Sequence, residues 1–231
     1  MHRVPPERPD QVLPRRTGGR GGPGAGRCGA LRRGGGALVV QGPAGAGKST
    51  LLRILGGLER PTRGRVELDG TDLATATESR LARIRAESIG SVSGDALPDP
   101  GLTVRQSVAG ALVPLGLHPA DCWELAGEAL EDVGMGGQLN LLSGGLDVGA
   151  RRRVALARAL VKRPTVLLAD EPTAGLTADT RDGMIDFFER LWSERRLSCI
   201  VATEDEALIR RAPRPATLSR GRVTALARST D

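Results

Sequence analysis

One short stretch of the chain has residue types and spacing suited to holding phosphate groups. Its members are Gly42, Pro43, Ala44, Gly45, Ala46, Gly47, Lys48, Ser49 and Thr50. The glycines let successive backbone N–H groups curl around an anion, and a helix that starts here would add the partial positive charge of its N-terminus. Lys48 can reach the β- and γ-phosphates of a nucleotide, and the Ser49 hydroxyl can hold Mg²⁺. The stretch therefore predicts a phosphate loop that binds a nucleotide.

The residues on either side of this stretch predict the two elements that must position it. Residues 37–40 are a short apolar, β-branched run, and residues 51–55 continue as a helix. Strand, glycine loop and helix in this order form the context in which the pattern binds phosphate.

A pair of acidic residues follows a second predicted strand. The apolar run within residues 164–169 is typical of a buried parallel strand, and Asp170 and Glu171 come directly after it. Because ligands gather at the carboxyl ends of parallel strands, we expect both side chains to face the phosphate loop. Asp170 would then bind Mg²⁺ beside Ser49, directly or through water. Glu171 would be the base for a water that attacks the γ-phosphate.

From Ala37 onward, predicted strands and helices alternate, which indicates an α/β domain with a largely parallel sheet over residues 37–228. We expect a P-loop sheet with helices on both faces, a small antiparallel β region and a helical subdomain inserted over about residues 95–160. Further strands are expected at 65–70, where the run ends in an Asp-Gly turn, and at 88–92 and 198–202. Helices are expected at about 78–86, up to 116, 120–133, 147–162 and 178–195. Thr103 and Gln106 have the spacing of a capping box.

Residues 1–36 form an arm rich in glycine, arginine and proline, which we expect to be unstructured. The arm carries eight arginines against Glu7 and Asp10, which accounts for the whole net charge of +6. The rest of the chain is balanced, with 25 basic and 25 acidic residues. The arm alone could touch nucleic acid or an anionic membrane, and for the folded part no nucleic-acid partner is expected.

The three cysteines, Cys28, Cys122 and Cys199, are far apart and form no metal-binding pair. This pattern suits a reducing cytosol without disulfides or a zinc site. We also expect no secretory signal and no membrane span, since no apolar run approaches the roughly 18 residues that a span needs.

Beyond these motifs, the chain resembles the ATP-binding subunits of ABC transporters over about residues 35–228. Residues 56–64 and 102–104 look most like the lipoprotein- and macrolide-exporter branch, and residues 154–160 resemble the helix that follows the family's signature loop. The resemblance implies ATP and Mg²⁺ as ligands. It also implies a second ATP-binding subunit, identical or different, and a transmembrane permease driven by their closure. The protein would then be cytoplasmic, held on the inner face of the cell membrane by that permease.

Several positions at which the family senses the γ-phosphate carry other residues. Gly94 stands where the Q-loop glutamine is expected, Thr177 where the D-loop has aspartate, and Glu204 where the switch histidine is expected. A carboxylate about 4 Å from a phosphate charge costs about 4 kcal/mol at an effective dielectric constant of roughly 20. Glu204 could equally begin the next helix, where an acid suits the helix dipole.

Adenine binding also departs from the family pattern, because residues 1–47 contain no aromatic residue to stack on the base. We therefore expect an ATPase with impaired hydrolysis. The alternative is a non-hydrolytic nucleotide-binding module that associates with a permease. A P-loop kinase fits poorly, since nothing resembles an acceptor site.

The signature loop has two possible registers. Ser143, Gly144 and Gly145 follow Leu142 and spell most of it, but Leu146 replaces the expected glutamine. Counting back from Val154 in the family's usual register places the signature at residues 146–150 instead. The two differ by four residues, about 6 Å along a helix. Both Ser143 and Asp147 are good N-cap residues, so capping preference leaves both registers open.

Overall fold

The computed structural model describes residues 36–93, 98–193 and 197–226. Six strands form the main sheet in the order β4-β5-β6-β1-β7-β8. They are β1 (Gly36–Gln41), β4 (Ile89–Val92), β5 (Val166–Asp170), β6 (Ser198–Ala202), β7 (Pro215–Ser219) and β8 (Arg222–Ala225). The strands from β4 to β7 pair in parallel, and β8 pairs antiparallel with β7. The short strands β2 (Glu67–Leu68) and β3 (Thr71–Asp72) make a separate antiparallel pair.

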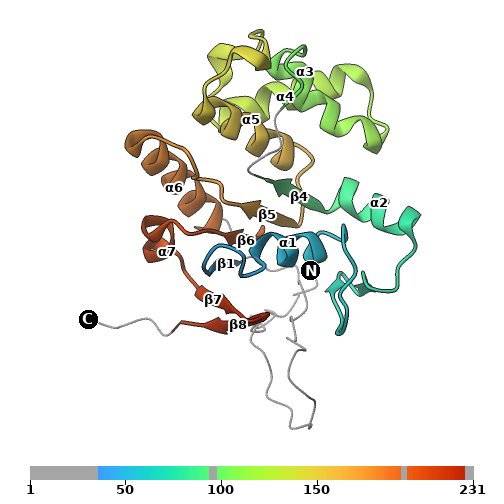
Figure 1. The fold of residues 1–231 in the computed structure, drawn as a ribbon. Coiled ribbons are helices and arrows are strands. Elements are labelled where there is room, and N and C mark those ends of the chain that lie inside the picture. Colours follow the sequence, from blue (N-terminus) through green and yellow to red (C-terminus); the bar gives the residue numbers. More distant parts are fainter. Residues whose placement is uncertain (1–35, 94–97, 194–196, 227–231) are drawn as a thin grey trace, which may run out of the picture.

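Helices cover both faces of the main sheet (Figure 1). On one face, α1 (Lys48–Leu55) and α2 (Glu78–Glu87) share a buried apolar cluster with Val40 of β1. On the other face, α5 (Val148–Leu160), α6 (Ala178–Ser193) and α7 (Glu206–Arg211) share a second cluster with Val39. Adjacent strand residues belong to opposite clusters because successive side chains of a strand point to opposite faces. The predicted α/β fold with a P-loop type of sheet is confirmed.

A group of helices lies between β4 and β5 in the sequence and beyond the β4 edge of the sheet in space (Figure 1). It contains α3 (Val104–Ala109), η1 (Gly110–Leu115), α4 (Pro119–Asp132), η2 (Gly136–Gln138), η3 (Ser143–Gly145) and α5. The helices α3, α4 and α5 pack against one another in pairs. The capping box is confirmed, since Thr103 and Gln106 each accept a hydrogen bond from the other's backbone N–H. This group corresponds to the helical insertion expected at about residues 95–160, whose limits stay a prediction.

Two of the expected elements differ in extent from the structure. The helix expected up to residue 116 changes after Ala109 into the 3₁₀ helix η1, which contains Pro114 and ends at Gly116 with φ +68°. Proline has no N–H for an α-helical bond, and glycine readily takes the left-handed conformation that ends a helix. Of the strand and turn expected at 65–70, the structure assigns only Glu67–Leu68 to a strand, and the expected turn follows at Asp69 and Gly70, which both take positive φ.

Gly36 belongs to the sheet rather than to the arm, because it is the first residue of β1 and is paired with Ser198. The rest of the predicted arm, residues 1–35, lies outside the described residues. Among the helices that the structure describes, none combines the length and the apolar character needed to cross a bilayer.

Candidate functional site

The loop between β1 and α1 has the backbone geometry that a phosphate cradle requires. Gly45 and Gly47 have φ angles of +77° and +94°, which residues with a side chain rarely adopt. Gly42 is needed for a different reason. A Cβ atom at this position would lie 2.7 Å from the carbonyl oxygen of Leu218 in β7. The neighbouring strand β7 therefore leaves no room for a side chain at Gly42. Within the loop, the Ala46 N–H donates to the Pro43 carbonyl oxygen at 3.0 Å.

Lys48, the first residue of α1, is buried beneath this loop with 7% of its surface exposed. Its ammonium donates to the Gly42 carbonyl oxygen at 2.7 Å, and this hydrogen bond fixes the lysine side chain against the loop. The same nitrogen lies 2.6 Å from Glu204 Oε1 and 3.6 Å from Glu171 Oε1. The next two residues, Ser49 and Thr50, are exposed. The sequence-predicted lysine and base therefore lie within ion-pair distance of each other.

Asp170 ends β5, where it is paired with Ala202 of β6. Its Oδ1 atom is buried and has no hydrogen-bond partner within the described residues. A buried carboxylate oxygen without a partner is costly unless a cation or a donor completes it, so Asp170 fits the predicted Mg²⁺ ligand. The described part of the chain contains no group of three or more acidic, histidine or cysteine side chains for a metal.

Glu171 follows Asp170 with a left-handed backbone, φ +46°. Its Oε2 atom accepts two hydrogen bonds of 3.1 Å, one from the Thr203 hydroxyl and one from the backbone N–H of Glu204. Thr203 is fully buried, and its hydroxyl also accepts from the Asp205 N–H at 3.0 Å. The loop between β6 and α7 thus fixes the orientation of the candidate base.

Thr203 is a site residue that the sequence analysis missed. The available signal was its position, since it comes directly after the buried strand β6 at the same sheet edge as Asp170. Its neighbour Glu204 lies ahead of α7, because Asp205 is the N-cap and the helix begins at Glu206. Glu204 is therefore outside the helix, and its carboxylate is paired with Lys48.

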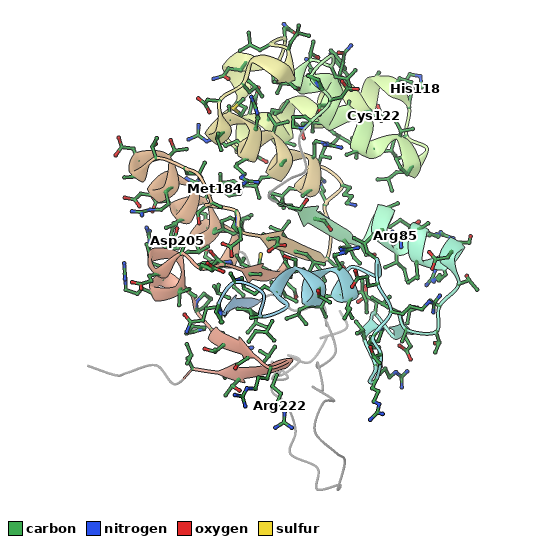
Figure 2. The ribbon with its side chains drawn as sticks, in the orientation of Figure 1. Arg85, His118, Cys122, Met184, Asp205 and Arg222 are labelled. Atoms are coloured by element: carbon green, nitrogen blue, oxygen red, sulfur yellow. The ribbon has the colours of Figure 1, made fainter. Side chains whose placement is uncertain are left out.

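No histidine takes the place of the switch residue in the described part of the chain. Figure 2 shows His118 at the outer end of the helical group, well apart from Asp205 at the start of α7. The other histidine, His2, lies outside the described residues, as does Gly94 at the expected Q-loop position. Thr177, at the D-loop position, forms a hydrogen bond of 2.9 Å with the hydroxyl of Thr180.

The two candidate signature registers have different structures. Ser143, Gly144 and Gly145 form the isolated 3₁₀ turn η3, in which the Ser143 hydroxyl is buried and has no partner among the described residues. The long helix α5 begins at Val148, and the carboxylate of its N-cap residue Asp147 accepts from Ala150 N–H at 2.8 Å. The geometry favours the register at residues 146–150, because only that segment leads into a helix N-terminus.

Comparison with known proteins agrees with this arrangement. A family model described as "ABC transporter" matches residues 32–174. The chain belongs to the ABC transporter family. A relative named "Lipoprotein-releasing system ATP-binding protein LolD" from Geobacter metallireducens is 38% identical over 81% of this chain and 84% of its own. The "Macrolide export ATP-binding/permease protein MacB" of Rhodopirellula baltica is 35% identical over 80% of this chain. That protein is longer, and the match covers 28% of it.

Solved structures lead to the same family. The dimeric structure of MJ0796, titled a bacterial ABC transporter cassette, has a TM-score of 0.76 and 30% identity, with 84% of each chain covered. The predicted resemblance to the ATP-binding domain of this family is thereby confirmed. The named relatives are also consistent with the lipoprotein- and macrolide-exporter branch.

Proposed function

We propose that the chain is the ATP-binding subunit of a membrane transporter, working with a permease and a second ATP-binding subunit, and that its own hydrolysis of ATP is weak. The observation that carries the binding half of this proposal is the buried Lys48 beneath a formed phosphate loop. Support for the partners comes from relatives named as ATP-binding proteins of export systems and from solved cassettes titled dimeric. Such a subunit would sit in the cytoplasm, on the inner face of the membrane.

In this proposal the phosphates of ATP lie on the N–H groups of residues 42–50, with Lys48 on the β- and γ-phosphates. Ser49 and Asp170 would hold Mg²⁺, which would neutralise charge that develops on the phosphates. Glu171 would accept a proton from the attacking water. Its Oε2 is already engaged by Thr203 and Glu204, so its Oε1 is the oxygen left to take that proton.

Weak hydrolysis follows from the residues at the sensing positions. Glu204 offers a carboxylate where the family resemblance calls for an imidazole, and Gly94 has no side chain to orient water. Each well-placed contact to a transition state is typically worth about 10²–10³-fold in rate. A subunit that lacks both contacts should bind ATP and turn it over slowly.

Steady-state ATPase assays test this proposal. We expect low turnover for the wild type and a rise of about tenfold or more for the double variant Gly94→Gln, Glu204→His. Adding Glu171→Gln should remove the gain, because the base is lost. Glu206→Gln is the matched control, since Glu206 lies on α7 and pairs with Arg210 instead. Turnover of several per second in the wild type, with no response to the repair, would contradict the proposal of impaired hydrolysis.

The alternative function is a non-hydrolytic module that binds nucleotide and a permease. The Glu204–Lys48 ion pair favours it over full catalytic competence, because the pair engages the lysine that a γ-phosphate needs. The assay separates the two functions. The non-hydrolytic module predicts binding of ATP without turnover in the wild type and in the repaired variant.

A further inference from the structure

The ammonium of Lys48 has three hydrogens to donate, and the protein already engages most of this capacity. Two oxygens lie at hydrogen-bond distance from it, the Gly42 carbonyl at 2.7 Å and Glu204 Oε1 at 2.6 Å. The third oxygen, Glu171 Oε1, lies at 3.6 Å, which is within reach of an ion pair but too far for a hydrogen bond. One donor of Lys48 is therefore open to a ligand without any rearrangement.

Glu204 and Lys48 are exposed to different degrees. The Lys48 side chain is 8% exposed and anchored in α1, whereas the Glu204 side chain is 53% exposed and projects from the loop before α7. Of the three oxygens around the ammonium, one is the backbone carbonyl of Gly42 and two are carboxylate oxygens. The Glu171 side chain is 29% exposed and accepts a hydrogen bond from Thr203, so it is less exposed than Glu204 and is held by a second contact. Glu204 is therefore the group that a ligand can displace from the lysine.

A phosphate loop lysine binds the β- and γ-phosphates of its nucleotide. A β-phosphate oxygen can take the open donor of Lys48 while the pair with Glu204 stays in place. A γ-phosphate oxygen needs a further donor, and the release of the exposed Glu204 side chain supplies it while the bond to the Gly42 carbonyl in the loop is kept. If Glu204 stays, its carboxylate meets the extra negative charge of a triphosphate at close range, with solvent screening reduced on the buried side of the pair.

We propose that Glu204 is a specificity residue that shifts this nucleotide site toward diphosphates, so that ADP is favoured over ATP compared with the same site without the carboxylate. The proposal rests on the proposed function, since it requires Lys48 to bind nucleotide phosphates. It goes beyond slow hydrolysis, because it concerns which nucleotide occupies the site at equilibrium. Triphosphate still binds, since the half-exposed Glu204 side chain can rotate into water at the loss of its ion pair.

Titration calorimetry on the full chain with Mg·ADP and Mg·ATP tests the proposal. The quantity to compare is the ratio of the two dissociation constants in the wild type, in Glu204→Gln and in Glu206→Gln. Glutamine keeps the size of the side chain and removes its charge. We expect Glu204→Gln to move the ratio toward ATP by about tenfold or more, about 1.4 kcal/mol. The control Glu206→Gln removes a carboxylate two residues away that pairs with Arg210, and should leave the ratio unchanged.

Thermal melts of the same proteins establish that each variant is folded, and Glu204→Ala replaces the glutamine variant if that one is not. Binding of both nucleotides with a ratio that no Glu204 variant moves would overturn the inference and leave the proposed function standing. Failure of the wild type to bind either nucleotide would overturn the proposed function itself. An equal shift in Glu206→Gln would show a general effect of surface charge and would also overturn the inference.

Discussion

The phosphate loop and the sensing positions of this molecule are built from different kinds of atoms. The loop at residues 42–50 would hold phosphate mainly with backbone N–H groups from one continuous segment, shaped by glycines and by β7 beside it. The positions that the family resemblance marks as sensors of the γ-phosphate are single residues from separate segments, Gly94, Thr177 and Glu204. Binding of phosphate by backbone N–H groups requires only the correct path of the backbone. Each sensing position, in contrast, requires one particular type of side chain.

The two regions also differ in charge. The loop offers a cation and a helix N-terminus to an anion, while the switch position carries the carboxylate of Glu204. That carboxylate is paired with Lys48 of the phosphate loop. The path of the loop is thus set by its backbone, whereas the residue at a sensor position can pair with another group of the protein.

The largest effect is expected from Lys48→Ala. The variant removes the cation for the β- and γ-phosphates and leaves Glu171 and Glu204 uncompensated beside them. Hydrogen bonds to charged groups are worth about 1.5–3 kcal/mol each, so calorimetry should find nucleotide binding weakened by about 100-fold or more.

Lys162, the only other lysine in the chain, is the matched control for this variant. It donates to the Arg85 carbonyl oxygen at 2.5 Å, and burial lowers its pKa. Lys162→Ala should leave nucleotide affinity unchanged, even if it lowers the melting temperature. Equal binding by the wild type and Lys48→Ala would exclude the phosphate loop as the nucleotide site.

An intermediate effect is expected from Gly42→Ala. The added Cβ would meet the Leu218 carbonyl oxygen at 2.7 Å, so the loop must move away from β7. Overpacking of this kind typically destabilises by about 1–3 kcal/mol, and we expect nucleotide affinity to fall by about tenfold because the N–H groups lose their alignment. Urea unfolding and calorimetry would measure the two effects.

Gly183→Ala is the control for this change, since Gly183 lies in α6 with open space around its Cβ position. Alanine is favoured over glycine in a helix, so stability should stay the same or rise. Unchanged binding by Gly42→Ala would mean that the path of the loop does not depend on contact with β7, which would weaken the contrast between main-chain and side-chain recognition.

The smallest effects concern the two signature registers. Asp147→Ala should lower the free energy of unfolding by about 1 kcal/mol, because α5 loses its N-cap. Ser143→Ala should be close to neutral or slightly stabilising, since it removes a buried hydroxyl that has no partner among the described residues. Denaturant titrations of both variants would rank them. A larger loss for Ser143→Ala would favour the register at residues 142–145.

Much of the fold was predictable because its signals are local. Residues 37–40 and 166–169 are apolar runs beside charged or glycine-rich turns, and each lies in a strand of the structure. The capping box at Thr103 was predicted from the same kind of short-range spacing. The break after Ala109 was not predicted, because an apolar periodicity does not distinguish an α-helix from the 3₁₀ helix into which it runs.

The candidate site was predictable only in part, for a related reason. The positions of Lys48 and Asp170 follow from sequence motifs, but the contacts of Glu204 depend on the order of strands in the sheet. Since β6 lies between β1 and β5, the loop after β6 meets both the phosphate loop and Glu171. The role of Thr203 has the same origin, and its signal in the sequence was only its place after a buried strand.

Glu204 reaches its two neighbours by different routes, the base through its backbone N–H and the lysine through its side chain. Every amino acid except proline has that N–H. Mutational drift at this position can therefore exchange one side chain for another without misplacing Glu171. Because the two contacts use different atoms of residue 204, this position is suitable for saturation mutagenesis. Proline alone should remove the hydrogen bond to Glu171, and the other replacements should change only the contact with Lys48.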